Sequence, residues 1–131
     1  MSEENVRIVR EMIDAFLRRD YARALESFDS AVEGDFTHMM DGRMTVGPEE
    51  LSAEVARWTS DWRELHTEVE EIRPAGDRVF MVLSQRGIGR RSGAETELRY
   101  AQIFTLRDRR IVAMKTYLDV DEARAEAGLT A

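Results

Sequence analysis

Three stretches in the second half of the chain carry the hydrophobic pattern of β-strands. They begin at Val79, Leu98 and Ile111, and short turn signals separate them. β-Branched and aromatic residues are frequent in all three, and such residues fit a pleated, half-buried surface. The pattern predicts a consecutive antiparallel meander between Arg78 and Asp119. A sheet of this size needs helices to cover one face.

The first half of the chain predicts those helices. Apolar residues recur at helical spacing from Val6 to Leu17, which favours a first helix over residues 4–18. Asp20 is a suitable N-cap for a shorter second helix, whose apolar stripe would extend to Phe28.

Gly47-Pro48 and the two glutamates that follow predict the start of a third helix. Its buried stripe would carry both tryptophans, Trp58 and Trp62. The segment 32–40 is ambiguous; if it is a strand, Phe36 and His38 share one face.

The remaining segments complete an α+β pattern. Residues 65–72 alternate between apolar and polar positions and predict a half-exposed strand. Asp121 is expected to cap a short C-terminal helix that ends near Gly128. Helices followed by strands indicate one α+β domain over residues 1–131, with helices packed on one sheet face.

Alternation along each strand divides its side chains between two faces. In the second strand of the meander, we expect these residues to point inward: Leu98, Tyr100, Gln102, Phe104 and Leu106. In the third strand, the expected inner set is Val112, Met114, Thr116 and Leu118, and the outer set includes Ile111 and Tyr117. The first strand is apolar on both faces near its start, which predicts cover on both sides; its inner face is expected to carry Phe80, Val82, Ser84, Arg86 and Ile88.

Polar groups then interrupt apolar inner faces. They are Arg86, Gln102 and Thr116, with the hydroxyl of Tyr100 and the imidazole of His38 as additions. A buried polar group lowers stability unless a partner satisfies it. Convergence of several such groups predicts either a closed internal network or the lining of a ligand pocket.

Composition narrows the classes of partner. The chain of 131 residues has a formal net charge of −7, which argues against nucleic acid or an anionic membrane surface as the main partner. It has no cysteine, so disulfides and zinc thiolates are excluded, and this fits a cytoplasmic location. No apolar run approaches the roughly 20 residues that a membrane span needs.

Short segments along nearly the whole chain match one family pattern. They are Asp77-Arg78-Val79, Leu98-Arg99-Tyr100-Ala101, Thr105-Leu106-Arg107-Asp108, Ile111-Val112, Tyr117-Leu118-Asp119, Glu122-Ala123 and Ala127-Gly128-Leu129. Together with the element order, they resemble the nuclear-transport-factor-2-like superfamily, and within it the SnoaL-like proteins related to polyketide cyclases, ketosteroid isomerase and limonene epoxide hydrolase. The resemblance implies a cone-shaped, curved, mixed or antiparallel sheet of about five to six strands, wrapped by three helices and enclosing a pocket.

The chain departs from these relatives at their catalytic positions. The ketosteroid isomerase base would fall at Thr37 or His38, its tyrosine at Met12 and its second acid at Gln102. The arginine of limonene epoxide hydrolase would match Arg86, but its two acids would fall at Ile88 and Thr116. Neither relative's mechanism transfers intact to this sequence.

Each candidate residue has a functional and a structural interpretation. His38 is the candidate base, since an imidazole transfers protons near neutral pH; the alternative is a partly exposed histidine at a strand end. Arg86 would bind a carboxylate or enolate in the pocket, or else pair with an acid such as Glu33 or Asp35. The candidate ligand-binding residues, which could equally be satisfied core residues, are Tyr100, Gln102, Trp58, Trp62 and Thr116.

No cofactor or metal is expected, because His38 and His66 are the only histidines and lie on different elements. The sequence favours a pocket for a small apolar molecule, with cofactor-free isomerisation, cyclisation or hydrolysis of a carbonyl- or epoxide-type compound. A non-catalytic ligand-binding or protein-interaction domain is the alternative. The outer face of the meander, with Ala101, Ile103, Ile111, Ala113 and Tyr117, predicts a homodimer interface.

Overall fold

The computed structural model describes residues 2–129. The elements, in chain order, are α1 (Ser2–Leu17), α2 (Tyr21–Leu25), β1 (Phe28–His38), β2 (Met44–Val46), α3 (Pro48–Thr59), β3 (Trp62–Ala75), β4 (Arg78–Gly89), β5 (Glu95–Arg107), β6 (Arg110–Tyr117) and α4 (Val120–Glu126). The six strands form one curved sheet in the order β2-β1-β6-β5-β4-β3. Strand pairs are antiparallel except for the parallel pair of β1 with β6. The predicted α+β fold class is confirmed.

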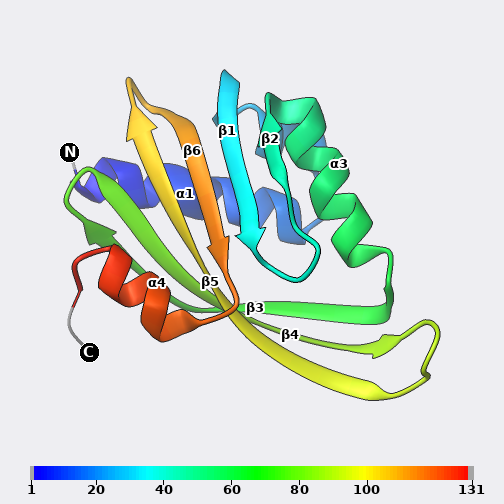
Figure 1. The fold of residues 1–131 in the computed structure, drawn as a ribbon. Helices are drawn as coiled ribbons and strands as arrows, with labels where there is room; N and C mark the ends of the chain where they lie inside the picture. The colour runs from blue at the N-terminus through cyan, green and yellow to red at the C-terminus, as the bar shows by residue number, and fades with distance from the viewer. Residues whose placement is uncertain (1, 130–131) are drawn as a thin grey trace.

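The helices divide between the two faces of the sheet (Figure 1). A first hydrophobic core joins α1 and α3 to one face of the sheet, which we call the inner face; it includes Val9, Phe36, Leu51, Met81 and Phe104. A second core joins α4 to the opposite, outer face and includes Phe80, Val82, Ala101, Ile103, Tyr117 and Ala123. Every residue from Val79 to Leu83 is buried, so the predicted cover on both sides of this strand is confirmed.

Several predicted boundaries are wrong. Trp62 begins β3 and does not belong to α3, which ends at Thr59. Phe28 begins β1, because α2 spans only Tyr21–Leu25. The cap of α4 is Asp119 rather than Asp121: its side chain accepts a hydrogen bond from the backbone N–H of Glu122 at 3.1 Å. β2 was not expected, since three residues are too few for a periodic pattern.

A β-bulge corrects the expected faces of β6. Thr105 pairs with Ala113, but the next residue, Leu106, pairs with Ile111. Val112 is therefore an extra residue on β6, and Ile111 returns to the inner face, where it is fully buried in the first core. Simple alternation had placed Ile111 outside.

The expected dimer surface is also corrected. Ala101, Ile103 and Tyr117 are buried in the second core, against α4, and Ile111 belongs to the first core. These side chains are covered within one chain, so they offer no apolar surface to a second copy. Ala113, the fifth residue of the expected set, is half-buried, and a homodimer remains a prediction. No helix among residues 2–129 combines the length and apolar content that crossing a membrane requires.

Candidate functional site

A cavity of about 910 Å³ lies between the inner face of the sheet and the helices α1, α2 and α3. Its lining is mainly apolar and includes Met12, Ile13, Phe16, Phe36, Leu51, Val55, Leu65, Leu83 and Met114. The lining also includes exposed residues such as Tyr21, Met40 and Arg63, so the cavity opens to solvent. Its volume falls in the range of pockets that hold drug-sized molecules.

Two tryptophans form part of one wall. Trp58 lies near the C-terminal end of α3 and Trp62 at the first position of β3, and their ring centroids are 6.3 Å apart. Gly87 of β4 allows this packing, because a Cβ atom there would lie 2.9 Å from Cε3 of Trp62. The short connection after α3 therefore places both indoles over β4.

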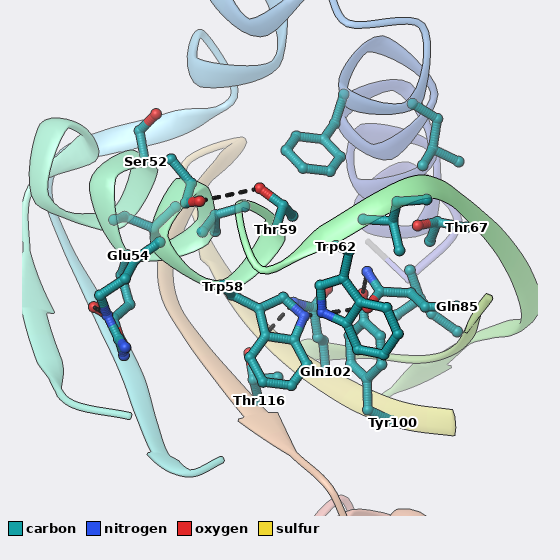
Figure 2. Close-up of a pocket in the computed structure, with 18 of the residues that line it drawn as sticks. Ser52, Glu54, Trp58, Thr59, Trp62, Thr67, Gln85, Tyr100, Gln102 and Thr116 are labelled. Atoms are coloured by element: carbon teal, nitrogen blue, oxygen red, sulfur yellow. Dashed lines mark hydrogen bonds and ion pairs between the residues drawn. The ribbon is translucent and has the colours of Figure 1, made fainter. Parts of the chain in front are cut away.

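A chain of hydrogen bonds links this wall to the sheet (Figure 2). The indole N–H of Trp58 donates to Oε1 of Gln85 at 3.1 Å. Nε2 of Gln85 in turn donates to the hydroxyl of Tyr100 at 3.0 Å. Gln85 is 3% exposed and Tyr100 is 7% exposed, and burial raises the pKa of the Tyr100 hydroxyl. We call Trp58, Gln85 and Tyr100 the relay.

A second polar pair lies farther along β5 and β6. Gln102 and Thr116 are register partners, and Nε2 of Gln102 donates to Oγ1 of Thr116 at 3.3 Å. Both residues line the cavity, and Thr116 is buried. The relay and this pair are uncharged, so the polar part of this wall consists of amide, hydroxyl and indole groups.

Glu54 of α3 is a buried carboxylate in the lining, 6% exposed. Figure 2 shows it apart from the relay. Its Oε2 lies 2.6 Å from the guanidinium of Arg57, and its Oε1 lies 3.4 Å from that of Arg43. The hydrogen bonds from Arg57 lower the pKa of Glu54, although burial opposes them. Within residues 2–129, no group of acids and histidines has the arrangement of a metal site.

The expected position of Arg86 is wrong. Register pairs Arg86 with Glu97 on β5 and with His66 on β3, and the side chain is exposed on the outer face. The inner face of β4 carries Val79, Met81, Leu83 and Gln85 instead. Val79–Leu83 is apolar on both faces, and α4 covers the outer one, so the hydrophobic pattern could not distinguish them.

His38 also lies outside the cavity lining. One extra residue on β1 separates the pairs Asp35–Lys115 and His38–Tyr117, and this bulge turns His38 to the outer face. There its ring stacks on Tyr117 with a centroid distance of 4.4 Å, and Nδ1 lies 3.5 Å from Glu122. His38 therefore does not lie where a base of the pocket was expected.

The structure brings together the other five predicted residues, namely Trp58, Trp62, Tyr100, Gln102 and Thr116, all of which line the cavity. Sequence reasoning missed Gln85 and Glu54. A usable signal for Gln85 was its neutral amide: of the two polar neighbours Gln85 and Arg86, the uncharged one is less costly to bury. Glu54 gave no such signal, because glutamates on a helix are ordinarily exposed.

The sequence was also compared with protein families. The SnoaL-like domain model matches residues 9–114, which is most of the chain. The chain belongs to the SnoaL-like domain family. The resemblance inferred from the sequence is thus confirmed. None of the curated proteins with which the sequence was compared matches it.

Solved structures with this SnoaL-like fold share little sequence with the chain. An NTF2-like protein from Burkholderia thailandensis E264 is 22% identical, with a TM-score of 0.80 and 99% of each chain covered. TerC co-crystallised with polyporic acid is 18% identical, with a TM-score of 0.74, over 95% of this chain and 98% of that chain. A hypothetical protein with a ketosteroid isomerase-like fold from Catenulispora acidiphila DSM 44928, in complex with trimethylamine, is 19% identical, with a TM-score of 0.71, over 94% and 93%. At these identities the likeness supports the fold alone.

Proposed function

We propose that this SnoaL-like protein binds a small, largely apolar and uncharged molecule in the cavity. The observation that carries the proposal is an open, mainly apolar hollow of about 910 Å³ whose wall presents two neutral amides, the buried Gln85 and the half-buried Gln102. Apolar walls with a few convergent polar groups are the usual form of a ligand site. A pocket packed solid with side chains would have given no such volume.

The charge of the wall supports an uncharged ligand. A charged ligand group buried in an apolar pocket needs a partner of opposite sign. Glu54, the buried acid of the lining, is already paired with Arg57 and Arg43. The other charged residues of the lining are exposed and do not lie in its buried part; they are Arg19, Arg63, Glu64 and Arg90. Arg86, which would have received an anion, lies on the other face of the sheet.

Two structural neighbours contribute to the proposal. TerC was co-crystallised with polyporic acid, and the Catenulispora protein was found in complex with trimethylamine. Proteins of this fold thus hold small organic molecules of different chemistry. We further propose a cytoplasmic protein without nucleic-acid or membrane partners, from its charge of −7 and lack of cysteine.

A thermal-shift screen against small carbonyl, steroid-like and terpene compounds, confirmed by calorimetry, tests binding. The blocking variant is Thr67→Phe, because Thr67 lines the cavity beside Gln85, its register partner on the neighbouring strand. The matched control is Glu68→Phe, which adds the same ring at the next position of β3, where the side chain is exposed. We expect hits with the wild type and the control, and at least a tenfold loss of affinity with Thr67→Phe. Equal affinity in both variants would count against the cavity as the site.

Cofactor-free isomerisation, cyclisation or hydrolysis of a carbonyl- or epoxide-type compound is the second candidate. The observation that favours it is the buried carboxylate of Glu54 in the same lining. The lowered pKa of Glu54 makes it a weak base, and His38 lies outside the lining, so binding without turnover is the better supported function. If a hit is turned over, we expect Glu54→Gln to lower kcat about 100-fold or more while binding persists. An unchanged kcat would exclude Glu54 as the base.

A further inference from the structure

The relay has a fixed direction. An indole N–H is a donor only, so the atom of Gln85 that faces Trp58 must be the acceptor Oε1. Flipping the amide would set two donors against each other. The NH₂ group of Gln85 therefore faces Tyr100, and the Tyr100 hydroxyl accepts from it. Trp58 thus determines the polarity of a residue two hydrogen bonds away.

The direction of the relay leaves the hydroxyl hydrogen of Tyr100 without an acceptor. A tyrosine hydroxyl carries a single hydrogen, and accepting from Gln85 does not use it. Within the part of the chain that the structure describes, Gln85 is the hydrogen-bond partner of the hydroxyl, and no carbonyl or carboxylate accepts from it. Tyr100 is 7% exposed, so most of its side chain has no contact with solvent. Tyr100 lines the cavity, and its hydrogen is therefore available to a molecule held there.

The hydroxyl stays a donor over a wide range of pH. Burial raises the pKa of Tyr100, which keeps the hydrogen in place at and well above neutral pH. The second polar pair, Gln102 and Thr116, differs from Tyr100 in the hydrogen-bonding groups that it offers to a ligand. Among residues 2–129, the Gln102 side chain makes the one hydrogen bond to Thr116, so its amide oxygen and second N–H can serve a donor or an acceptor.

We propose that Tyr100 is a specificity-determining donor, and that the ligand of the cavity carries a neutral carbonyl-type oxygen that accepts its hydrogen. The inference rests on the proposed function, because it requires that the cavity hold a small molecule. A hydrocarbon of the same shape would leave the hydroxyl hydrogen unsatisfied. A ligand group that can only donate would meet a second donor.

The test uses two rigid probes that differ at one position, 9-fluorenone with a carbonyl and fluorene with a methylene. Both tryptophans of the chain line the cavity, so intrinsic fluorescence reports binding there, and calorimetry gives the Kd. We expect the wild type to prefer fluorenone by roughly tenfold. In Tyr100→Phe, which removes only the hydroxyl, the preference should vanish while the affinity for fluorene is retained.

A second variant separates the relay from the hydroxyl itself. Gln85→Glu, measured at pH 8, introduces a carboxylate that accepts from both Trp58 and Tyr100. The hydroxyl remains but its hydrogen is used, so the preference for fluorenone should be lost here too. Thermal unfolding verifies that each variant is folded. If Tyr100→Phe does not fold, the binding of the two probes to the wild type and to Gln85→Glu tests the proposal.

The outcomes distinguish the two proposals. Equal binding of both probes by the wild type would overturn the assignment of Tyr100 and leave the binding function standing. A preference for fluorenone that survives in the variants would also overturn it. Binding of neither probe would count against the cavity as a site for apolar molecules, and the assignment would fail with it.

Discussion

Single side chains in the cavity wall are held by partners that set their chemistry. Gln85 can be satisfied at both ends of its amide only in one orientation, because Trp58 has no acceptor on its ring. Glu54 remains ionised in a buried position because two arginines face it. In both cases, a neighbour decides whether the group acts as donor, acceptor or charge.

The pH dependence of stability should report the Glu54 ion pair. The pKa of Glu54 is lowered in the folded protein, so its stabilisation is present above the ordinary glutamate pKa and is lost as the pH falls through the folded value. We expect Glu54→Gln to lower the free energy of unfolding by about 1 kcal/mol at pH 7. As the pH falls below the ordinary glutamate pKa, the gap to the wild type should narrow. Urea unfolding at several pH values measures the difference in the free energy of unfolding between the variant and the wild type.

The control for this prediction is Glu68→Gln. Glu68 is an exposed carboxylate on β3 that makes no ion pair within residues 2–129. Its substitution should change the free energy of unfolding at pH 7 by less than about 0.5 kcal/mol. A gap for Glu54→Gln that stays constant from pH 7 to pH 3 would show that packing rather than charge accounts for its effect.

At the scale of elements, bulges and helix α4 decide which side chains face the cavity. One extra residue in β1 turns His38 outward, and one in β6 turns Ile111 inward. α4 packs on the outer face and is held there by Arg124, whose guanidinium makes two hydrogen bonds of 3.1 Å with Glu71. The same group lies 4.9 Å above the ring of Phe80. The outer-face side chains Phe80 and Val82 of β4 are buried for this reason.

Removing the Arg124 side chain should loosen this docking. We expect Arg124→Ala to lower the free energy of unfolding at pH 7 by about 1–2 kcal/mol, through loss of the paired hydrogen bonds and of the contact with Phe80. The hydrogen bonds from Arg124 lower the pKa of Glu71, so the effect should diminish as the pH falls through that pKa. Urea unfolding at two pH values measures both effects.

Lys115→Ala is the matched control on the same face. Lys115 lies 4.0 Å from Glu126 of α4, and both side chains are about half exposed. Such a pair contributes little, and its loss should change stability by less than about 0.5 kcal/mol. Equal effects of the two substitutions would mean that Arg124 has no special part in docking α4.

At the scale of the whole molecule, one sheet separates two different interiors. The inner face, with α1 and α3, surrounds an open cavity, whereas the outer face meets α4 in a small apolar core. Without α4, the second core would become an exposed apolar patch on the outer face. Its sheet residues are Phe80, Val82, Ala101, Ile103 and Tyr117.

A chain that ends at Leu118 should therefore associate with itself or unfold. Large exposed apolar patches drive association, because burying them is favourable. We expect a higher sedimentation coefficient or a lower unfolding midpoint than for residues 1–131, together with increased binding of an apolar dye. Leu129→Ala, a change at the edge of the second core, serves as the control and should retain the properties of the wild type. Unchanged sedimentation and stability after truncation would contradict the role assigned to α4.

The oligomeric state of the full chain is measured in the same sedimentation experiment. A homodimer remains our prediction, but Ala101, Ile103 and Tyr117 are not accessible to form it while α4 is docked. A monomer at micromolar concentration would reject the homodimer.

Sequence alone determined the fold class and most of the helices and strands of this protein, because amphipathic spacing and turn residues are local properties of the chain. It also predicted Tyr100, Gln102, Thr116 and the tryptophans as candidate pocket residues, with satisfied core residues as the alternative, and all five line the cavity. Only the tertiary structure decided which face of each strand meets the cavity. Two strand-pairing bulges and the docking of α4 control that choice, and both depend on contacts between residues far apart in sequence. Gln85 rather than Arg86 therefore lies in the wall, since burial of either face of β4 satisfies the hydrophobic pattern equally well.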